Sequence, residues 1–205
     1  MSPDEYRAAV KEAGAFDPLT LAPAVEERLM AHLEEHLGYL QHMTPIDGKI
    51  YVGILHPLPT FVTAINLTLW WVHGPKKGRI AEMSEIIRGW YDAATHHEPH
   101  KALRMERSDA LDLLRRDIGE VFVWNARGMF PELASYPEPA QVAVVDLCRN
   151  QSWMRENVNL STAIARRVWD CAADLVLSIP LYTDHRAALR DLFMEATECS
   201  NPSKD

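Results

Sequence analysis

Apolar residues recur at three- and four-residue spacing through most of this chain, which is the periodicity of amphipathic helices. One such stripe consists of Val25, Leu29, Leu33, Leu37 and Leu40 and predicts a helix that ends near residue 43. The pattern then changes once, because turn residues at 44–48 precede a β-rich run at 49–55. Many helices and one short hairpin predict an α+β fold that is mainly α.

Helical periodicity elsewhere predicts further helices at residues 3–13, 61–73, 79–95, from 108 onward, 140–149, 161–178 and 184–198. The chain shows no internal repeat and no linker-like run. We therefore expect an N-terminal helical extension at 1–22, one folded domain at 23–198 and a flexible tail at 199–205.

Composition narrows the class of protein. With 205 residues, 47% of them hydrophobic, the chain is long enough to bury a core without cross-links. The net charge of -8 argues against nucleic-acid binding. The longest apolar stretch, residues 61–72, is too short to span a bilayer. Residues 1–14 are polar and do not resemble a secretory leader, so synthesis in the cytoplasm is expected.

Three cysteines, Cys148, Cys171 and Cys199, form no CxxC pair and favour a reducing compartment. Cys148 and Cys171 fall within apolar helical patterns and are predicted to be buried thiols. A second group of potential ligands, His96, His97 and His100, is interrupted by Pro99. Surface histidines are the simpler interpretation of that group, so we expect neither a metal site nor a cofactor.

Glu34 and Glu35 precede the predicted hairpin, and this pair is the first candidate for chemistry. A glycosidase needs one carboxylic acid to protonate the leaving oxygen and a second group to activate water or stabilise the transition state. Glu35 fits the first role, and Asp47 is the nearby carboxylate for the second. The alternative is that both are hydrated surface carboxylates, as paired glutamates on helices usually are.

Residues 35–56 resemble the active-site segment of phage-type lysozymes, glycoside hydrolase family 24. That family has a catalytic Glu at the end of a helix, an Asp nine residues later, a Thr on the hairpin and a closing Gly-x-Gly-His. Glu35 and His56 match the first and last of these. Residues 106–117, 139–150 and 160–173 are similar, in the same order, to later helices of the family.

The resemblance implies a two-lobed fold, with a hairpin at about 44–56 and a helical lobe at about 105–198. Residues 57–104 match poorly and are interpreted as an insertion. Two catalytic positions differ from the family, because Thr44 stands in place of the Asp and Tyr51 in place of the Thr. Three interpretations stay open: Asp47 has taken over, a single acid suffices, or catalysis has been lost.

In the catalytic interpretation, a buried Glu35 has a raised pKa and acts as the acid. Asp47, or a water held by Thr44 or Tyr51, then acts on the opposite face of the sugar. His56, Trp70 and Asn150 are the candidate substrate-binding residues. Trp70–Trp71 and Trp90–Tyr91 either line a sugar cleft or, as their helical spacing favours, belong to the core.

The function that this resemblance implies is a muramidase-like glycosidase that cleaves the β-1,4 glycan of peptidoglycan. It would act in the periplasm or cell wall after delivery, as a phage endolysin or an injected antibacterial effector. An immunity or delivery protein is then a possible partner besides the glycan. The alternative is a catalytically inactive, lysozyme-like binding or structural module of a phage or secretion particle.

Overall fold

The computed structural model describes residues 20–149 and 151–200. The chain divides into two compact units. The hairpin unit is Leu33–Asp117, and the helical unit combines the residues up to His32 with those from Ile118 onward. The predicted class, α+β and mainly α, is confirmed.

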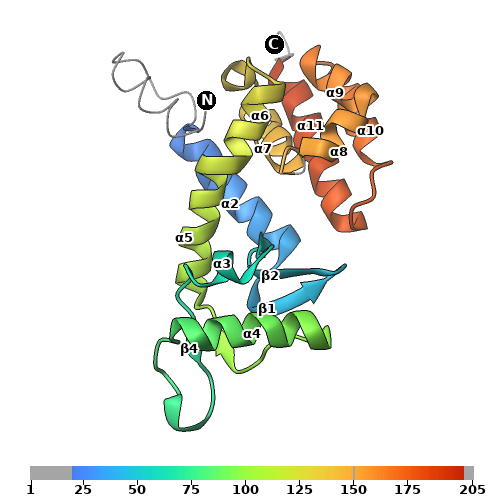
Figure 1. The fold of residues 1–205 in the computed structure, drawn as a ribbon. Helices are drawn as coiled ribbons and strands as arrows, with labels where there is room; N and C mark the ends of the chain where they lie inside the picture. The colour runs from blue at the N-terminus through green and yellow to red at the C-terminus, as the bar shows by residue number, and fades with distance from the viewer. Residues whose placement is uncertain (1–19, 150, 201–205) are drawn as a thin grey trace. The chain divides into compact units, whose positions relative to one another are not determined.

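The hairpin unit contains a three-stranded antiparallel sheet, a two-stranded sheet and several helices (Figure 1). In chain order its elements are the end of α2 (Pro23–Leu37), β1 (Leu40–Ile46), β2 (Lys49–Gly53), β3 (His56–Pro57), α3 (Phe61–Ala64), β4 (Trp70–Trp71), the 3-10 helix η1 (Gly74–Lys76), α4 (Met83–His96), β5 (Leu103–Arg104) and α5 (Arg107–Asp117). Helix α4 packs against β1 and β2, as Figure 1 shows.

The turn between β1 and β2 follows from local sequence. Asp47 and Gly48 both have positive φ, 48° and 75°, which is the conformation of a two-residue type I′ turn. Asp-Gly is a preferred pair for this turn because both residues tolerate the left-handed region. The turn fixes the register, with Ile46 opposite Lys49 and Thr44 opposite Tyr51.

Helix α2 ends earlier than the apolar stripe predicts. Its last residue is Leu37, and Gly38 follows with φ of 73°, which is the usual helix-ending conformation of glycine. The prediction that the helix continues to residue 43 is therefore wrong, and Leu40 already begins β1. The apolar spacing of this stretch suited a helix, but the glycine overrides it.

Residues 61–73 also differ from their predicted single helix. Only Phe61–Ala64 is helical, and Trp70–Trp71 forms β4, which pairs with β5. That pairing joins segments far apart in the chain, so no local pattern reports it. Helix α4 is confirmed in place but begins at Met83, where Glu82 and Glu85 form a reciprocal capping box.

The apolar core of the hairpin unit draws on both the sheet and the segment that matched the lysozyme family poorly. Its largest fully buried members are Met43, Leu58, Leu69, Leu103 and Met105. Trp71 and Trp90 are partly buried and pack against this cluster. Residues 57–104 thus share one core with the hairpin.

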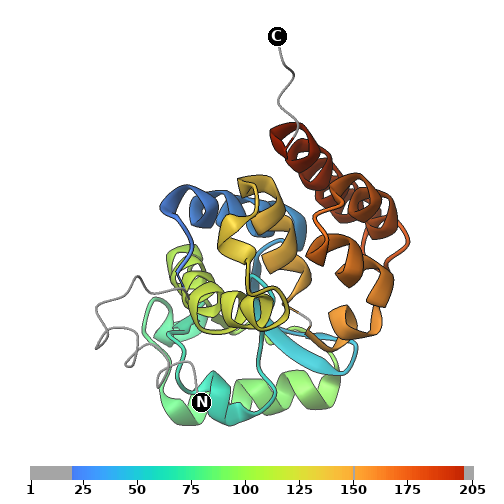
Figure 2. The same ribbon diagram turned by 90° about the horizontal axis from the view of Figure 1, so that it is seen from above.

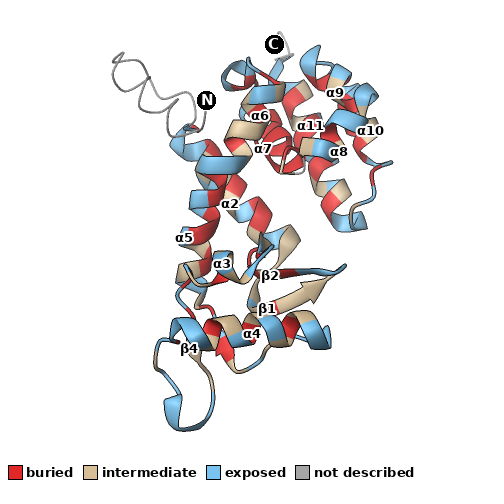
Figure 3. Ribbon diagram, in the orientation of Figure 1, coloured by how far each residue is buried: buried red, intermediate tan, exposed pale blue. Residues whose placement is uncertain are grey.

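The helical unit contains the start of α2, the π-helix η2 (Ile118–Phe122), α6 (Val123–Met129), the 3-10 helix η3 (Leu133–Ser135), α7 (Glu138–Leu147), α8 (Gln151–Glu156), α9 (Val158–Ala165), α10 (Trp169–Val176) and α11 (Thr183–Ser200). Residues 142–147 of α7 and the following residue 148 are all buried, and most of the helix is red in Figure 3. Helix α11 packs against α7 and α10, and Figure 2 shows α10 and α11 side by side.

Two details of the helical unit correct the predicted elements. The predicted helix at 161–178 is two helices, because Arg167 adopts φ of 58° between α9 and α10. Helix α8 lies where no helix was predicted. The predicted helix at 3–13 lies outside the described residues, and α11 reaches Ser200.

Candidate functional site

The two glutamates at the end of α2 have different surroundings. Glu35 is exposed, and among the described residues it forms no ion pair. Glu34 is about 25% exposed at its side chain, and its Oε1 lies 2.6 Å from Nε of Arg107. Successive helical residues point about 100° apart, so only one of the pair faces the start of α5. Glu35 therefore lacks the burial that the catalytic interpretation requires.

The hairpin brings Thr44 and Tyr51 together. They are directly opposite in the antiparallel register, so their side chains share one face of the sheet. Oγ1 of Thr44 donates a hydrogen bond to the carbonyl oxygen of His42 at 2.9 Å. Asp47 lies instead at the exposed turn, three residues along the strand from Thr44.

His56 is held by a partner that the sequence did not reveal. Its Nδ1 lies 2.6 Å from Oδ2 of Asp117, and the two side chains are 15% and 13% exposed. This contact joins β3 to the last residue of α5. The predicted substrate-binding histidine thus has one ring nitrogen engaged inside the hairpin unit.

Trp70 contacts a residue that lines a small pocket. Its indole Nε1 donates a hydrogen bond to Oδ2 of Asp109 at 3.4 Å. Asp109 belongs to the first turn of α5 and lines a pocket of about 210 Å³. The other lining residues are Asn66, Leu67, Thr68, Met105, Asp112, Leu113 and Arg116. Both polar and apolar side chains thus line this pocket. The third predicted substrate-binding residue, Asn150, lies outside the described residues.

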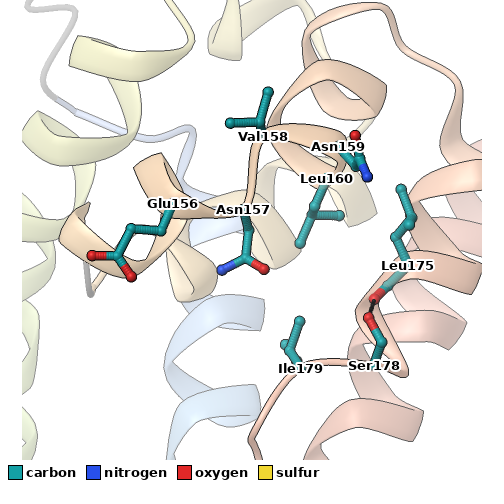
Figure 4. A pocket seen from close by; sticks show the side chains of 8 residues that line it. All are labelled: Glu156, Asn157, Val158, Asn159, Leu160, Leu175, Ser178 and Ile179. Atoms are coloured by element: carbon teal, nitrogen blue, oxygen red, sulfur yellow. Dashed lines mark hydrogen bonds between the residues drawn. The ribbon is translucent and has the colours of Figure 1, made fainter.

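A second pocket, of about 240 Å³, lies in the helical unit between α9 and the end of α10 (Figure 4). Its lining residues are Glu156, Asn157, Val158, Asn159, Leu160, Leu175, Ser178 and Ile179. Two of its polar groups already bond the backbone: Nδ2 of Asn157 donates to Trp153 O at 2.8 Å, and Oγ of Ser178 donates to Leu175 O at 2.7 Å.

The most strongly buried polar cluster is also in the helical unit. Oδ2 of Asp146 lies 2.9 Å from Nε2 of His32 and 2.5 Å from Nε2 of His185, and Nε of Arg149 donates to Oδ1 at 2.7 Å. Burial alone would raise the pKa of Asp146. The charge of Arg149 and the histidine hydrogen bonds outweigh burial and hold that pKa well below its usual range.

The sequence carries a signal for this cluster in the placement of its three members. His32 and His185 lie on the apolar stripes of their helices, three residues after Leu29 and four before Leu189. Asp146 sits in an otherwise apolar run. A charged residue inside such a run has to find partners, since an unpaired buried charge is very costly.

The remaining candidates separate by burial. Cys148 is buried. Its burial, and to a smaller extent the negative charge of Asp146, raise the pKa of its thiol to about 12. Cys171 is exposed, so its predicted burial is wrong. His96 and His97 are exposed, whereas His100 is partly buried, and its Nδ1 lies 3.6 Å from Oδ2 of Asp92. Burial lowers the pKa of His100.

Comparison with known proteins gives no indication of the function of this chain. No family model, curated protein or solved structure matches this chain. Within the described ranges, no helix has the length and apolarity to cross a membrane. The site must therefore be interpreted from its own geometry and chemistry.

Proposed function

We propose that this protein is a non-catalytic, lysozyme-like module that binds the glycan of peptidoglycan through the pocket beside Trp70. The observation that carries the proposal is the hydrogen bond from Trp70 to Asp109, a residue of a pocket lined by both polar and apolar side chains. The expected partner is then cell-wall glycan, which the module would meet in the periplasm or cell wall as part of a phage or secretion particle.

The pocket has the chemistry that sugars require. Carboxylates and amides accept and donate hydrogen bonds to hydroxyl and acetamido groups, and an indole offers an apolar face for a pyranose ring. Asp109, Asn66 and Arg116 supply the polar groups. The volume of about 210 Å³ is below the ~300–1,000 Å³ of pockets for drug-sized ligands. One sugar unit is therefore the expected occupant, with the rest of the strand lying outside.

The end of α2 supports a binding role over catalysis. The lysozyme resemblance places a catalytic Glu at the end of this helix, and Glu35 lies in the last turn of α2. Glu35 is exposed, so it lacks the enclosure in which glycosidases hold their general acid. Asp47 is likewise exposed at the hairpin turn.

Hydrolysis remains the competing proposal, and one observation favours it. Glu34, beside Glu35, is partly shielded and is held by Arg107, as an oriented active-site carboxylate is expected to be. In that case the protein would be a muramidase-like enzyme, delivered as an endolysin or an effector. The two functions differ in whether covalent bonds of the glycan are broken.

A pull-down with purified sacculi, together with titration of soluble β-1,4-linked N-acetylglucosamine oligosaccharides, tests binding. We expect Trp70→Ala and Asp109→Asn to weaken binding about tenfold or more, as loss of a stacking face or a charged hydrogen bond does. Trp153→Phe, in the helical unit, is the matched control and should bind like the wild type. Equal binding by all four proteins would refute the proposed site.

Mass spectrometry of the soluble products released from sacculi tests the competing function. Wild type, Glu34→Gln and Glu35→Gln are incubated in parallel, with circular dichroism to confirm that each variant is folded. We expect no muropeptides above the buffer control. Products released by the wild type and lost in either glutamate variant would establish a hydrolase instead.

A further inference from the structure

Three potential metal ligands converge inside the helical unit from three separate helices. His32 comes from α2, Asp146 from α7 and His185 from α11. One ligand atom from each lies within 4.8 Å of the other two. The side chains are 8%, 1% and 1% exposed, so this is a built interior cluster and not a surface coincidence.

The orientation of the two imidazoles is specific. Both present Nε2, and both direct it at the same carboxylate oxygen, Oδ2 of Asp146, at 2.9 Å and 2.5 Å. The other carboxylate oxygen, Oδ1, accepts the hydrogen bond from Arg149. Oδ2 and the two ring nitrogens therefore lie close together, and hydrogen bonds to both carboxylate oxygens hold the carboxylate in place.

We propose that His32, Asp146 and His185 bind a divalent transition metal ion of the zinc class. Two imidazole nitrogens and one carboxylate oxygen are common ligands of such ions, and a water is the expected fourth. Metal–ligand bonds of about 2.0–2.2 Å place tetrahedral ligand atoms about 3.4 Å apart. The two observed contacts need to widen by less than about 1 Å to admit the ion.

Arg149 has a positioning role in this site. By holding Oδ1, it leaves Oδ2 as a single coordinating oxygen, in the way that outer hydrogen bonds orient metal ligands. Each imidazole must carry its remaining proton on Nδ1 to coordinate through Nε2. The ion then replaces two N–H hydrogen bonds to Oδ2 by three coordinate bonds, and it links α2, α7 and α11.

The inference is independent of glycan binding, because it concerns other residues in the other unit. Its competitor is a metal-free cluster in which the two rings simply donate hydrogen bonds to Asp146. The two differ in one measurable respect: only a metal site takes up one ion per chain with a change in the electronic spectrum of that ion.

The test titrates the full-length chain, first dialysed against a chelator, with Co²⁺ and follows visible absorption. We expect intense bands of low-coordinate cobalt that saturate at one equivalent and disappear when Zn²⁺ is added. Zn²⁺ should also raise the thermal midpoint, because an ion that binds only the folded state stabilises it. A wild-type chain without the one-to-one bands overturns the proposal, and no variant is needed for that result.

Variants locate the ion. His32→Gln and His185→Gln should abolish the cobalt bands, and Arg149→Gln should weaken affinity by about 10–100-fold while the bands remain. His96→Gln, at the exposed end of α4, is the control for surface histidines and should titrate like the wild type. If a ligand variant does not fold, the Arg149→Gln result still discriminates. Bands that survive in folded His185→Gln, or vanish in His96→Gln, overturn the assignment.

Discussion

The two units handle their acidic groups differently. In the hairpin unit Glu35 and Asp47 are in water, whereas in the helical unit Asp146 is buried and accepts hydrogen bonds from three side chains. A carboxylate in water needs no particular partner, but a buried one is tolerated only with compensating donors. An acid that lies near a sequence motif is therefore weaker evidence of chemistry than an acid that the fold encloses.

Some acids of the hairpin unit are enclosed as well, and Asp117 is an example. Asp117 is largely buried and bonds His56, so it behaves like Asp146 on a smaller scale. Burial, rather than membership of either unit, therefore separates the two kinds of acid. Substitutions at each should differ in effect according to how far the carboxylate is enclosed.

The largest effect is expected at Asp146. Asp146→Asn removes the charge that Arg149 balances and leaves two imidazoles with a weaker acceptor. Breaking a buried charged network in this way costs about 3–5 kcal/mol of unfolding free energy. Urea denaturation measures it, with exposed Asp174→Asn of α10 as the control. A loss below about 1 kcal/mol would mean that the cluster is no more constrained than the surface.

A smaller loss is expected at Asp117. Asp117→Asn replaces a hydrogen bond to a charged carboxylate, worth about 1.5–3 kcal/mol, by a neutral one worth about 0.5–1.5 kcal/mol, so we expect a loss of about 1 kcal/mol. Asp112→Asn, at a 78% exposed position of the same helix, provides the control. Should the two variants unfold at the same denaturant concentration, the His56–Asp117 contact contributes nothing and the comparison fails in the hairpin unit.

The contribution of Glu85 to the free energy of unfolding should depend on pH. A hydrogen bond from Lys76, followed by those from Trp71 and the backbone of Glu82, lowers the pKa of Glu85 far below its ordinary 4.5. A lowered pKa stabilises the fold above the unfolded value and loses that contribution as the pH falls through the folded value. The stability gap between wild type and Glu85→Gln should therefore narrow as the pH is lowered from 7 toward about 3.

Urea midpoints measured across this range check the Glu85 prediction. The nearby Glu82→Gln is a useful comparison, because the Glu82 side chain is 72% exposed and its ion pair with Arg79 is of the weak surface type. A gap that stays constant or widens on acidification would show that the Lys76 and Arg79 contacts do not hold Glu85 ionised.

The smallest effect is expected at the exposed acids. Glu35→Gln with Asp47→Asn should change the unfolding free energy by no more than about 0.5 kcal/mol, as surface substitutions away from special features do. Glycan binding should also be unchanged. A loss of more than about 1 kcal/mol, or a loss of binding to sacculi, would show that the two carboxylates take part in a site after all.

Local sequence predicted features that depend on few neighbours. The Asp47–Gly48 turn follows from two residues that tolerate positive φ, and α7 follows from one continuous apolar run. Features that depend on distant partners were missed. The local pattern of Trp70–Trp71 predicts a helix, but pairing with β5 makes this segment a strand. The local pattern of Cys171 predicts burial, but its side chain is exposed.

The candidate sites divide in the same way. The sequence pointed to Glu35, Asp47 and the hairpin pair, because these residues are close together in the chain. It did not point to Asp117 as the partner of His56, which is 61 positions away, or to His32 as the partner of Asp146, which is 114 away. Residue type indicates which groups are able to react, but separation in the chain hides which groups meet.

The sequence by itself determined the mainly helical class, the β-rich interruption and the hairpin turn, since these follow from periodicity and backbone preference. Which polar groups are enclosed depends on how distant segments pack. The tertiary structure placed Trp70 beside Asp109, left Glu35 in water and gathered His32 and His185 around Asp146. Burial arises when distant segments pack together, and burial in turn shifts the pKa of the enclosed groups. No local sequence pattern encodes either effect.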